Sequence, residues 1–211
     1  IMRVDPKIDK DIIDAAKNLK IIGVCSVGLN HIDMDYAKEK GIQIFNAPGL
    51  NANAVAELTI SKMLDISRGT MTANTDVKVK HEWDKYKFVG RELRGKTLGV
   101  MGFGRIGRRV GELGRAFGMT VVAYDPFLKA EDFEKENATG MSIEELLKVA
   151  DFVSIHVPLT PETKDLFNAK SIAEMKDDAV VLNMSRGGIV NEKDMYEALK
   201  AGKIGGYATD V

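Results

Sequence analysis

The most informative stretch of this sequence for its fold is Thr97-Leu98-Gly99-Val100-Met101-Gly102-Phe103-Gly104-Arg105-Ile106-Gly107. The apolar residues before Gly102 predict a buried strand, and the residues from Arg105 onward predict a helix over 105–117. Between strand and helix, three glycines have the spacing Gly-x-Gly-x-x-Gly. The first permits a tight turn, the second lets a pyrophosphate approach the backbone, and the third lets helix and strand pack closely. The stretch therefore predicts a dinucleotide-binding turn, with cofactor contacts at Gly102, Gly104, Arg105, Ile106 and Gly107.

An acidic residue follows at the distance that such a turn needs. Asp125 comes directly after the next predicted strand, 21 residues beyond Gly104. A carboxylate there accepts hydrogen bonds from both hydroxyls of the adenosine ribose and repels the extra phosphate of NADP. No Arg or Lys follows before Lys129, so the sequence predicts NAD as the cofactor. Two other interpretations stay open: an Asp that only starts a turn before Pro126, and a methyltransferase with a related glycine pattern.

Three arginines, Arg105, Arg108 and Arg109, form a basic cluster near the predicted phosphate site. The positive end of the helix and its exposed amides already favour an anion there. For Arg108 and Arg109 we expect a solvated helix face.

Strands and helices alternate after Lys96, and their connections are too long for hairpins. This pattern predicts an α/β fold, a Rossmann-type doubly wound parallel sheet with helices on both faces. Capping signals mark helix starts at Ser142 with Glu145, at Ser171 with Glu174, and at Thr160 before Pro161. The predicted strands span residues 97–101, 120–124, 152–156, 179–183 and 206–211, and the predicted helices span residues 105–117, 143–149, 172–175 and 192–200.

The first 50 residues form a smaller α/β unit in this prediction. Helical spacing over residues 9–20 leads into an apolar strand at 21–24, and a helix capped by Asp33 leads into a strand at 42–45. Pro48 and Gly49 then break the pattern. We expect part of one domain at residues 1–50 and a nucleotide-binding domain at 51–211.

The region after the border carries a predicted helix and a surface connection. Residues 51–77 contain no proline and are rich in helix-forming residues, so we expect one long helix there. Residues 78–96 are charged and show little periodicity. We expect a surface connection with Trp83 as its packing anchor.

Charge and composition exclude several classes of protein. Lys+Arg 30 against Asp+Glu 31 gives a formal net charge of -1, which leaves no basic field for nucleic acid or an anionic membrane. No apolar run approaches the ~20 residues of a membrane span. The single cysteine, Cys25, argues against a disulfide or a thiolate metal cluster. We expect a small-molecule partner, no metal and a cytoplasmic location. Ile1 at the start and a predicted strand at the end suggest a fragment.

Several motifs in consistent order resemble the D-isomer-specific 2-hydroxyacid dehydrogenases. They are SVGLNHID at 26–33, FNAPGLN at 45–51, VAEL at 55–58, HVPLTPET at 156–163, LNMSRGGIV at 182–190 and ATDV at 208–211. The resemblance covers nearly the whole chain. It implies reversible hydride transfer between NAD and the C2 carbon of a small 2-hydroxy or 2-oxo acid. It also implies that residues 1–50 belong to a flavodoxin-like substrate-binding domain.

The resemblance assigns roles to individual residues. Arg186 would pair with the carboxylate and the carbonyl oxygen of the substrate, a task suited to a planar charged fork, and a structural or phosphate-facing arginine is the alternative. Backbone groups at Val27 and Gly28, with Asn51 nearby, would complete the substrate pocket, and Asn51 also fits a helix N-cap. Asp210 would hold the nicotinamide carboxamide. The cofactor cleft would further be lined by His156, Val157, Pro158, Met184 and Ser185.

Catalysis in the family also uses a glutamate and a proton-donating histidine, which would lie in the sequence that follows Val211. His31, His81 and His156 match neither role. We therefore expect this chain to bind NAD but to turn over slowly or not at all. The alternative is an NAD-sensing scaffold or corepressor of the same fold, and Arg186 and the near-neutral charge favour the enzyme. The resemblance also implies a homodimer through the nucleotide domain, with a contribution from the helix after Asn51.

Overall fold

The chain divides into two compact units, Ile1–Asn51 and Ala52–Val211. The computed structural model describes residues 1–3 and 5–211. The division falls one residue after the border that the sequence analysis placed at residue 50. Each unit has a buried core of its own.

The larger unit is built on a six-stranded sheet in the order β5-β4-β3-β6-β7-β8, and every neighbouring pair is parallel. The order steps outward from the β3–β6 pair in both directions, as a doubly wound sheet requires. The predicted Rossmann-type fold is therefore confirmed. The strands are β3 (Thr97–Met101), β4 (Thr120–Tyr124), β5 (Thr139–Gly140), β6 (Phe152–Ile155), β7 (Ala179–Asn183) and β8 (Ile204–Thr209).

Both faces of this sheet are covered. All residues of β7 are buried, and they alternate between two cores: Val180 and Leu182 belong to one, Ala179 and Val181 to the other. A central strand of a parallel sheet is buried on both faces for this reason and has no polar alternation.

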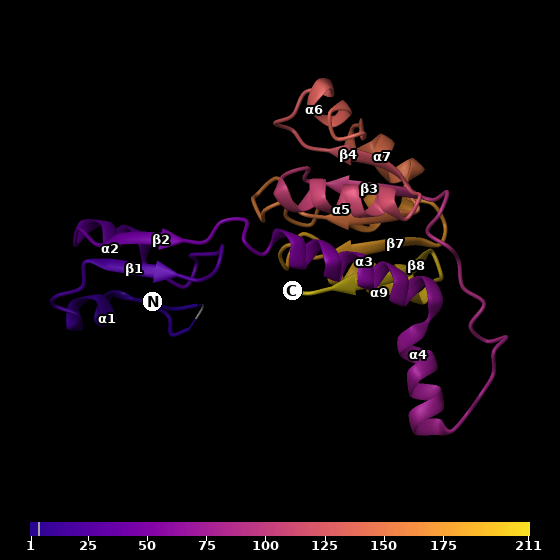
Figure 1. Cartoon of the computed structure of the whole chain (residues 1–211), viewed down its shortest axis with the longest axis horizontal. Coiled ribbons are helices and arrows are strands. Elements are labelled where there is room, and N and C mark those ends of the chain that lie inside the picture. The colour runs from indigo at the N-terminus through magenta and orange to yellow at the C-terminus, as the bar shows by residue number, and fades with distance from the viewer. Residues whose placement is uncertain (4) are drawn as a thin grey trace. The chain divides into compact units, whose positions relative to one another are not determined.

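Helices close the two cores from opposite sides. Over the first core, α3 and α5 pack side by side (Figure 1). Over the second core, α7, α8 and α9 supply the apolar side chains. These helices are α3 (Ala52–Arg68), α5 (Arg105–Ala116), α7 (Ile143–Val149), α8 (Ala169–Ala173) and α9 (Glu192–Lys200). Across residues 1–3 and 5–211, no helix combines the length and the apolar character that crossing a membrane requires.

The smaller unit has two parallel strands joined by a helix, with a further helix before them. The side chain of Asp33 caps the joining helix, because its Oδ1 accepts from the amide of Tyr36 at 3.0 Å. This cap was expected from the sequence. The elements are α1 (Lys10–Ala15), β1 (Ile21–Val24), α2 (Met34–Glu39) and β2 (Gln43–Asn46).

The single long helix predicted over residues 51–77 is wrong. α3 ends at Arg68, and Gly69 has a left-handed conformation with a φ of 62°. Glycine adopts this conformation without the steric cost of a Cβ atom, so the helix breaks there. The chain continues as α4 (Thr70–Thr75) and a π-helical turn, η1 (Asp76–Lys80).

Two predicted helix starts are also wrong. No helix follows Thr160 and Pro161, where the chain forms a turn in which Thr163 Oγ1 accepts from the amide of Thr160 at 2.8 Å. The helix expected at residues 172–175 begins earlier, because Asn168 caps it by accepting from the amide of Ser171 at 3.3 Å. The side chains in both signals can cap a helix, but in the folded chain they form other local hydrogen bonds.

Two short elements escaped the sequence analysis, α6 (Ala130–Glu134) and β5. Neither is long enough to show a periodic pattern of apolar residues. α6 nevertheless contributes Phe133, which is buried in the first core beside the glycine turn.

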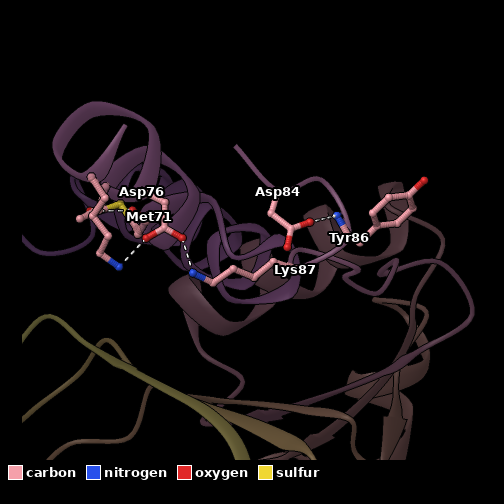
Figure 2. A network of polar contacts seen from close by, with 7 residues as sticks. Met71, Asp76, Asp84, Tyr86 and Lys87 are labelled. Carbon is pink, nitrogen blue, oxygen red and sulfur yellow. Dashed lines mark hydrogen bonds and ion pairs between the residues drawn. The ribbon is translucent and has the colours of Figure 1, made fainter. Parts of the chain in front are cut away.

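An arm formed by residues 70–91 leaves the sheet of the larger unit and returns to it as an extended connection (Figure 1). Asp76 fastens the arm internally: its carboxylate accepts from Lys80 at 2.7 Å and from Lys87 at 2.5 Å (Figure 2). The hydrogen bond from Lys80, followed by that from Lys87, lowers the pKa of Asp76. Trp83 is 82% exposed, so its expected role as a packing anchor is wrong. The connection runs away from the sheet, and the core does not reach the indole.

Candidate functional site

The residues predicted at the cofactor follow a single row of strand ends. In the strand register, Met101 pairs with Tyr124 and with Ile155, and Asn183 pairs with Ile155 and with Thr209. All these strands are parallel, so the residues that follow them lie at one edge of the sheet. Those residues are Gly102, Asp125, His156, Met184 and Asp210. Open parallel sheets bind ligands beyond this carboxyl edge.

Close backbone contacts determine the conformation of the glycine turn between β3 and α5. Gly102 has a φ of 86°, and a Cβ atom there would lie 2.8 Å from the carbonyl oxygen of His156. A Cβ atom on Gly107 would overlap the carbonyl oxygen of Gly102. At Gly104, in contrast, a Cβ atom would meet no other atom within 4 Å. The turn is therefore closed on its inner side and open where a ligand would approach Gly104.

The N-terminus of α5 meets the requirements of an anion site. Gly104 is the N-cap residue and supplies no side-chain cap, and the first turn contains no acidic residue. Arg105 and Ile106 open the helix, and Ile106 packs against the first core. The backbone amides of a first helical turn and the positive end of the helix dipole favour negative charge at this point. The turn therefore fits the pyrophosphate of a dinucleotide.

Asp125 links the predicted ribose site to the glycine turn. One of its oxygens, Oδ2, accepts from the amide of Phe103 at 2.9 Å, and Oδ1 accepts from the amide of Phe127 at 3.0 Å. A carboxylate oxygen has two lone pairs, so each still has capacity for a ribose hydroxyl. Asp125 thus starts a local turn, as one open interpretation held, and also faces the glycine turn.

His156 is held as a neutral side chain. Its Nε2 lies 2.7 Å from Oγ of Ser154, and burial lowers the pKa of His156 to about 4. Its amide donates to the carbonyl oxygen of Met101 at 2.7 Å, which fixes the turn after β6 next to Gly102. Val157 beyond it is buried, whereas Pro158 is exposed. An imidazole that is neutral at pH 7 is unsuited to donate protons, and the non-catalytic role expected from the sequence stays a prediction.

Arg186 stands on a turn that Asn183 organises. Asn183 is buried, its Oδ1 accepts from the amide and the hydroxyl of Ser185, and its Nδ2 donates to the carbonyl oxygen of Arg186 at 2.8 Å. The side chain of Arg186 is exposed and donates from Nη1 to the carbonyl oxygen of Ser185 at 2.7 Å. The sequence analysis missed Asn183. The available signal was a polar residue at the end of an otherwise apolar strand.

Asn183 also holds the last predicted cofactor residue. Its carbonyl oxygen accepts from the amide of Asp210 at 3.2 Å, just beyond β8. Asp210 is exposed at the carboxyl edge, and Met184 is buried in the first core. The backbone of one buried asparagine therefore aligns the ends of β7 and β8.

Two of the three predicted substrate residues of the smaller unit lie around one hollow, and Gly28 is not among the residues that line it. Val27 and Asn51 both line a cavity of about 460 Å³ at the carboxyl ends of β1 and β2. The carbonyl oxygen of Val27 accepts from Asn46 Nδ2 at 2.8 Å, and that of Gly28 accepts from Ser26 Oγ at 3.1 Å. These bonds fix the loop after β1. Asn51 directly precedes α3, and its place before a helix matches the N-cap alternative in position.

Comparisons with known proteins show the family to which this sequence is similar. The sequence model of a family described as D-isomer specific 2-hydroxyacid dehydrogenase, NAD binding domain, matches residues 60–211. The whole chain aligns with the D-3-phosphoglycerate dehydrogenase of Methanocaldococcus jannaschii at 45% sequence identity, and the alignment covers 40% of that enzyme. The whole chain also aligns with the hydroxypyruvate reductase of Thermotoga maritima at 43% sequence identity, and the alignment covers 68% of that enzyme.

A solved structure extends the likeness to three dimensions. D-lactate dehydrogenase from Aquifex aeolicus, complexed with NAD and lactic acid, aligns with a TM-score of 0.83 and 38% sequence identity. The alignment covers 99% of this chain and 62% of that chain. This chain thus spans less than two thirds of that enzyme and less than half of the Methanocaldococcus enzyme.

Proposed function

This chain belongs to the D-isomer-specific 2-hydroxyacid dehydrogenase family, whose NAD-binding domain it contains, and from that premise we propose its part in the reaction. It binds NAD and a small 2-hydroxy or 2-oxo acid so that a hydride passes between the nicotinamide and C2 of the acid. The observation that carries this proposal is the row of strand ends that brings Gly102, Asp125, His156, Met184 and Asp210 to one edge.

The residues of the larger unit bind and orient the cofactor. NAD, when bound, accepts or supplies the hydride. The open backbone at Gly104 and the amides at the start of α5 receive the pyrophosphate. Asp125 accepts from the adenosine ribose and disfavours the extra phosphate of NADP. Asp210 holds the nicotinamide carboxamide.

Arg186 orients the acid. Its guanidinium is exposed at the carboxyl edge, and a planar fork with two parallel donors matches a 2-oxo acid carboxylate and its neighbouring carbonyl oxygen. Within the smaller unit, the amides of Val27 and Gly28, together with Asn51, are the groups that we propose for binding the acid. Positioning of this kind supplies much of the rate enhancement of a two-substrate reaction. The glutamate and histidine for proton transfer match no residue of this sequence, so low turnover of the 211-residue polypeptide stays a prediction.

Phosphoglycerate is the substrate we propose first. The relative from Methanocaldococcus jannaschii, a D-3-phosphoglycerate dehydrogenase, supports this choice at 45% identity. Hydroxypyruvate is the next choice, at 43% identity. Both relatives are enzymes, which favours a dehydrogenase over the NAD-sensing scaffold. The single Cys25 supports a reducing, cytoplasmic setting.

A homodimer through the larger unit is part of the proposal. The arm of residues 70–91 supports it, because Met71, Val77 and Val79 are exposed there as large apolar side chains. Apolar groups gathered on a projecting segment favour burial against another protein surface. Sedimentation as a monomer at high concentration would contradict a dimer.

Calorimetric titration with NAD and with NADP tests the cofactor site. We expect NAD to bind with clear preference and Asp125→Ala to weaken it, because the variant removes the ribose acceptor. Equal affinity for the two dinucleotides would contradict the assignment of Asp125. No binding of NAD by the folded chain would overturn the proposed function.

A further inference from the structure

The middle residue of the glycine turn is fastened on three sides. The amide of Phe103 donates to Asp125 Oδ2 at 2.9 Å, and its carbonyl oxygen accepts from Arg108 Nε at 3.1 Å. Its side chain is fully buried, and its ring centroid lies 5.6 Å from that of Phe133. Both flanking residues are glycines, so among residues 102–104 Phe103 supplies the side chain that packs into the core.

Arg108 is itself held by the segment after α6. Its Nη1 lies 2.8 Å from Oε1 of Glu136, while its Nε remains on the carbonyl oxygen of Phe103. Phe133 lies within α6, and the amide of Glu136 donates to its carbonyl oxygen at 3.0 Å. Residues 133–136 therefore hold the glycine turn twice, once through the aromatic rings and once through the ion pair.

Arg108 and Arg109 are exposed to a similar degree, at 36% and 37%, but their partners differ. Arg109 pairs with Glu112 at 2.7 Å, one turn along α5, and its Nε donates to Asn53. None of these bonds involves the glycine turn. The two neighbouring arginines thus differ in what they hold, although the sequence presents them alike.

We propose that Arg108 and Glu136 are positioning residues for the phosphate-binding turn, acting through Phe103. Glycine-rich backbone is free to occupy many conformations, and ordering it on ligand binding costs entropy. A turn that is fixed beforehand avoids this cost and presents the amides after Gly104 in the orientation that the pyrophosphate needs. The inference rests on the proposed NAD site and adds to it a support that no residue of the motif itself supplies.

A purely electrostatic role for Arg108 predicts the opposite behaviour of one variant. If Arg108 only attracted the phosphates, removal of the nearby carboxylate in Glu136→Gln would strengthen binding of an anionic ligand or leave it unchanged. If Glu136 holds Arg108 on Phe103, the same change weakens binding. The sign of the effect separates the two roles.

The experiment measures NAD affinity by calorimetry for the wild-type chain and for Arg108→Gln, Glu136→Gln and Glu112→Gln. The last variant is the matched control, because it removes a carboxylate of equal charge from an arginine of the same helix that does not touch the turn. We expect the first two variants to weaken NAD binding about tenfold, which corresponds to about 1.4 kcal/mol, and the control to leave it unchanged. Stronger or unchanged binding by Glu136→Gln would overturn the inference.

Amide hydrogen exchange of Phe103 without ligand provides a second readout. The Arg108→Gln and Glu136→Gln variants should accelerate exchange of this amide, while the Glu112→Gln control should not. Thermal unfolding should shift little in all three, because the ion pairs are partly exposed. Unchanged exchange at Phe103 would overturn the inference. A wild-type chain that binds no NAD but shows accelerated exchange in the two variants would overturn the proposed function and leave the fastening of the turn standing.

Discussion

The Oγ atom of Ser154 lies 2.7 Å from Nε2 of His156, and within the described residues the buried Nδ1 of the same ring has no hydrogen-bond partner. The imidazole is therefore paired on one side only, at the point where β6 ends beside the glycine turn. Burial lowers its pKa to about 4, so the ring is neutral over the physiological range. Its surroundings have a direct consequence for stability against pH.

Folding stability should fall as the pH drops from about 6.5 toward 4. The unfolded chain takes up a proton on His156 at the ordinary pKa of 6.5, whereas the folded chain does so only near 4. The unfolded state thus binds more protons in this window, and stability is fully present above it. The contribution is on the order of 3 kcal/mol. Urea unfolding between pH 4 and 7 should show a flatter profile for His156→Gln than for the wild type. Parallel profiles would contradict the burial of a neutral ring.

Two glycines of one turn should respond differently to the same substitution. Gly102→Ala places a Cβ atom 2.8 Å from a backbone oxygen at a φ of 86°, so we expect a loss of about 2 kcal/mol or more in the free energy of unfolding. Gly104→Ala meets no atom within 4 Å, and we expect nearly unchanged stability. Its methyl group would nevertheless occupy the approach of the pyrophosphate and weaken NAD binding. Urea unfolding and calorimetry test the pair, and NAD affinity unaltered in Gly104→Ala would contradict the placement of the phosphates.

Asn183 and Arg186 should separate stability from substrate binding. Asn183 is buried and makes three hydrogen bonds within its turn, so Asn183→Ala should reduce the free energy of unfolding by about 1–3 kcal/mol. Arg186→Gln alters an exposed side chain and should change stability by about 0.5 kcal/mol or less. In a form of the protein that turns over substrate, Arg186→Gln should instead raise KM and lower kcat/KM for the 2-oxo acid. An unaltered kcat/KM would count against Arg186 as the substrate ligand.

The arm of residues 70–91 should loosen when Asp76 is neutralised. Asp76→Asn removes the negative charge that pairs with Lys80 and Lys87. Trypsin should then cleave more readily at the lysines of the arm. Glu82→Gln is the matched control, because it removes the same charge from the same connection, and the charge of Glu82 is only the smallest of the causes that act on the pKa of Lys80. We expect faster cleavage only in the first variant, with the unfolding midpoint of the main sheet unaltered. Equal cleavage rates would show that the clamp does not order the arm.

Lowering the pH should release the arm in the same way. The folded-state pKa of Asp76 lies below its ordinary value of 3.8, so the clamp is fully present above that value and is lost as the pH falls through the lowered pKa. Exchange of the Glu82 amide, which donates to the carbonyl oxygen of Asp76, reports this locally. Its rate, corrected for the intrinsic pH dependence, should rise only below about pH 4.

Elements with a local sequence pattern could be predicted before the structure was known. The strands Thr97–Met101, Thr120–Tyr124 and Ala179–Asn183 and the helices Ile143–Val149 and Glu192–Lys200 have the bounds that their apolar runs and caps predict. The glycine turn was also predicted, because its Gly-x-Gly-x-x-Gly spacing is complete within six consecutive residues. The parallel sheet followed from the alternation of these elements, and with it the edge at which the site residues meet.

Features that depend on neighbours distant in the chain could not be predicted from the sequence, because they arise from tertiary packing. Arg108 and Arg109 look alike in the sequence, yet only Arg108 reaches Glu136, 28 residues away, and through Phe103 the glycine turn. Trp83 is a residue type that commonly packs against a core, but its exposure depends on the path of the arm in the folded chain. Helix propensity predicts one continuous helix over residues 51–77, whereas the left-handed conformation of Gly69 breaks the helix there. Periodicity records which face of an element is apolar, whereas the partner of a polar side chain is set by the packing that brings two segments together.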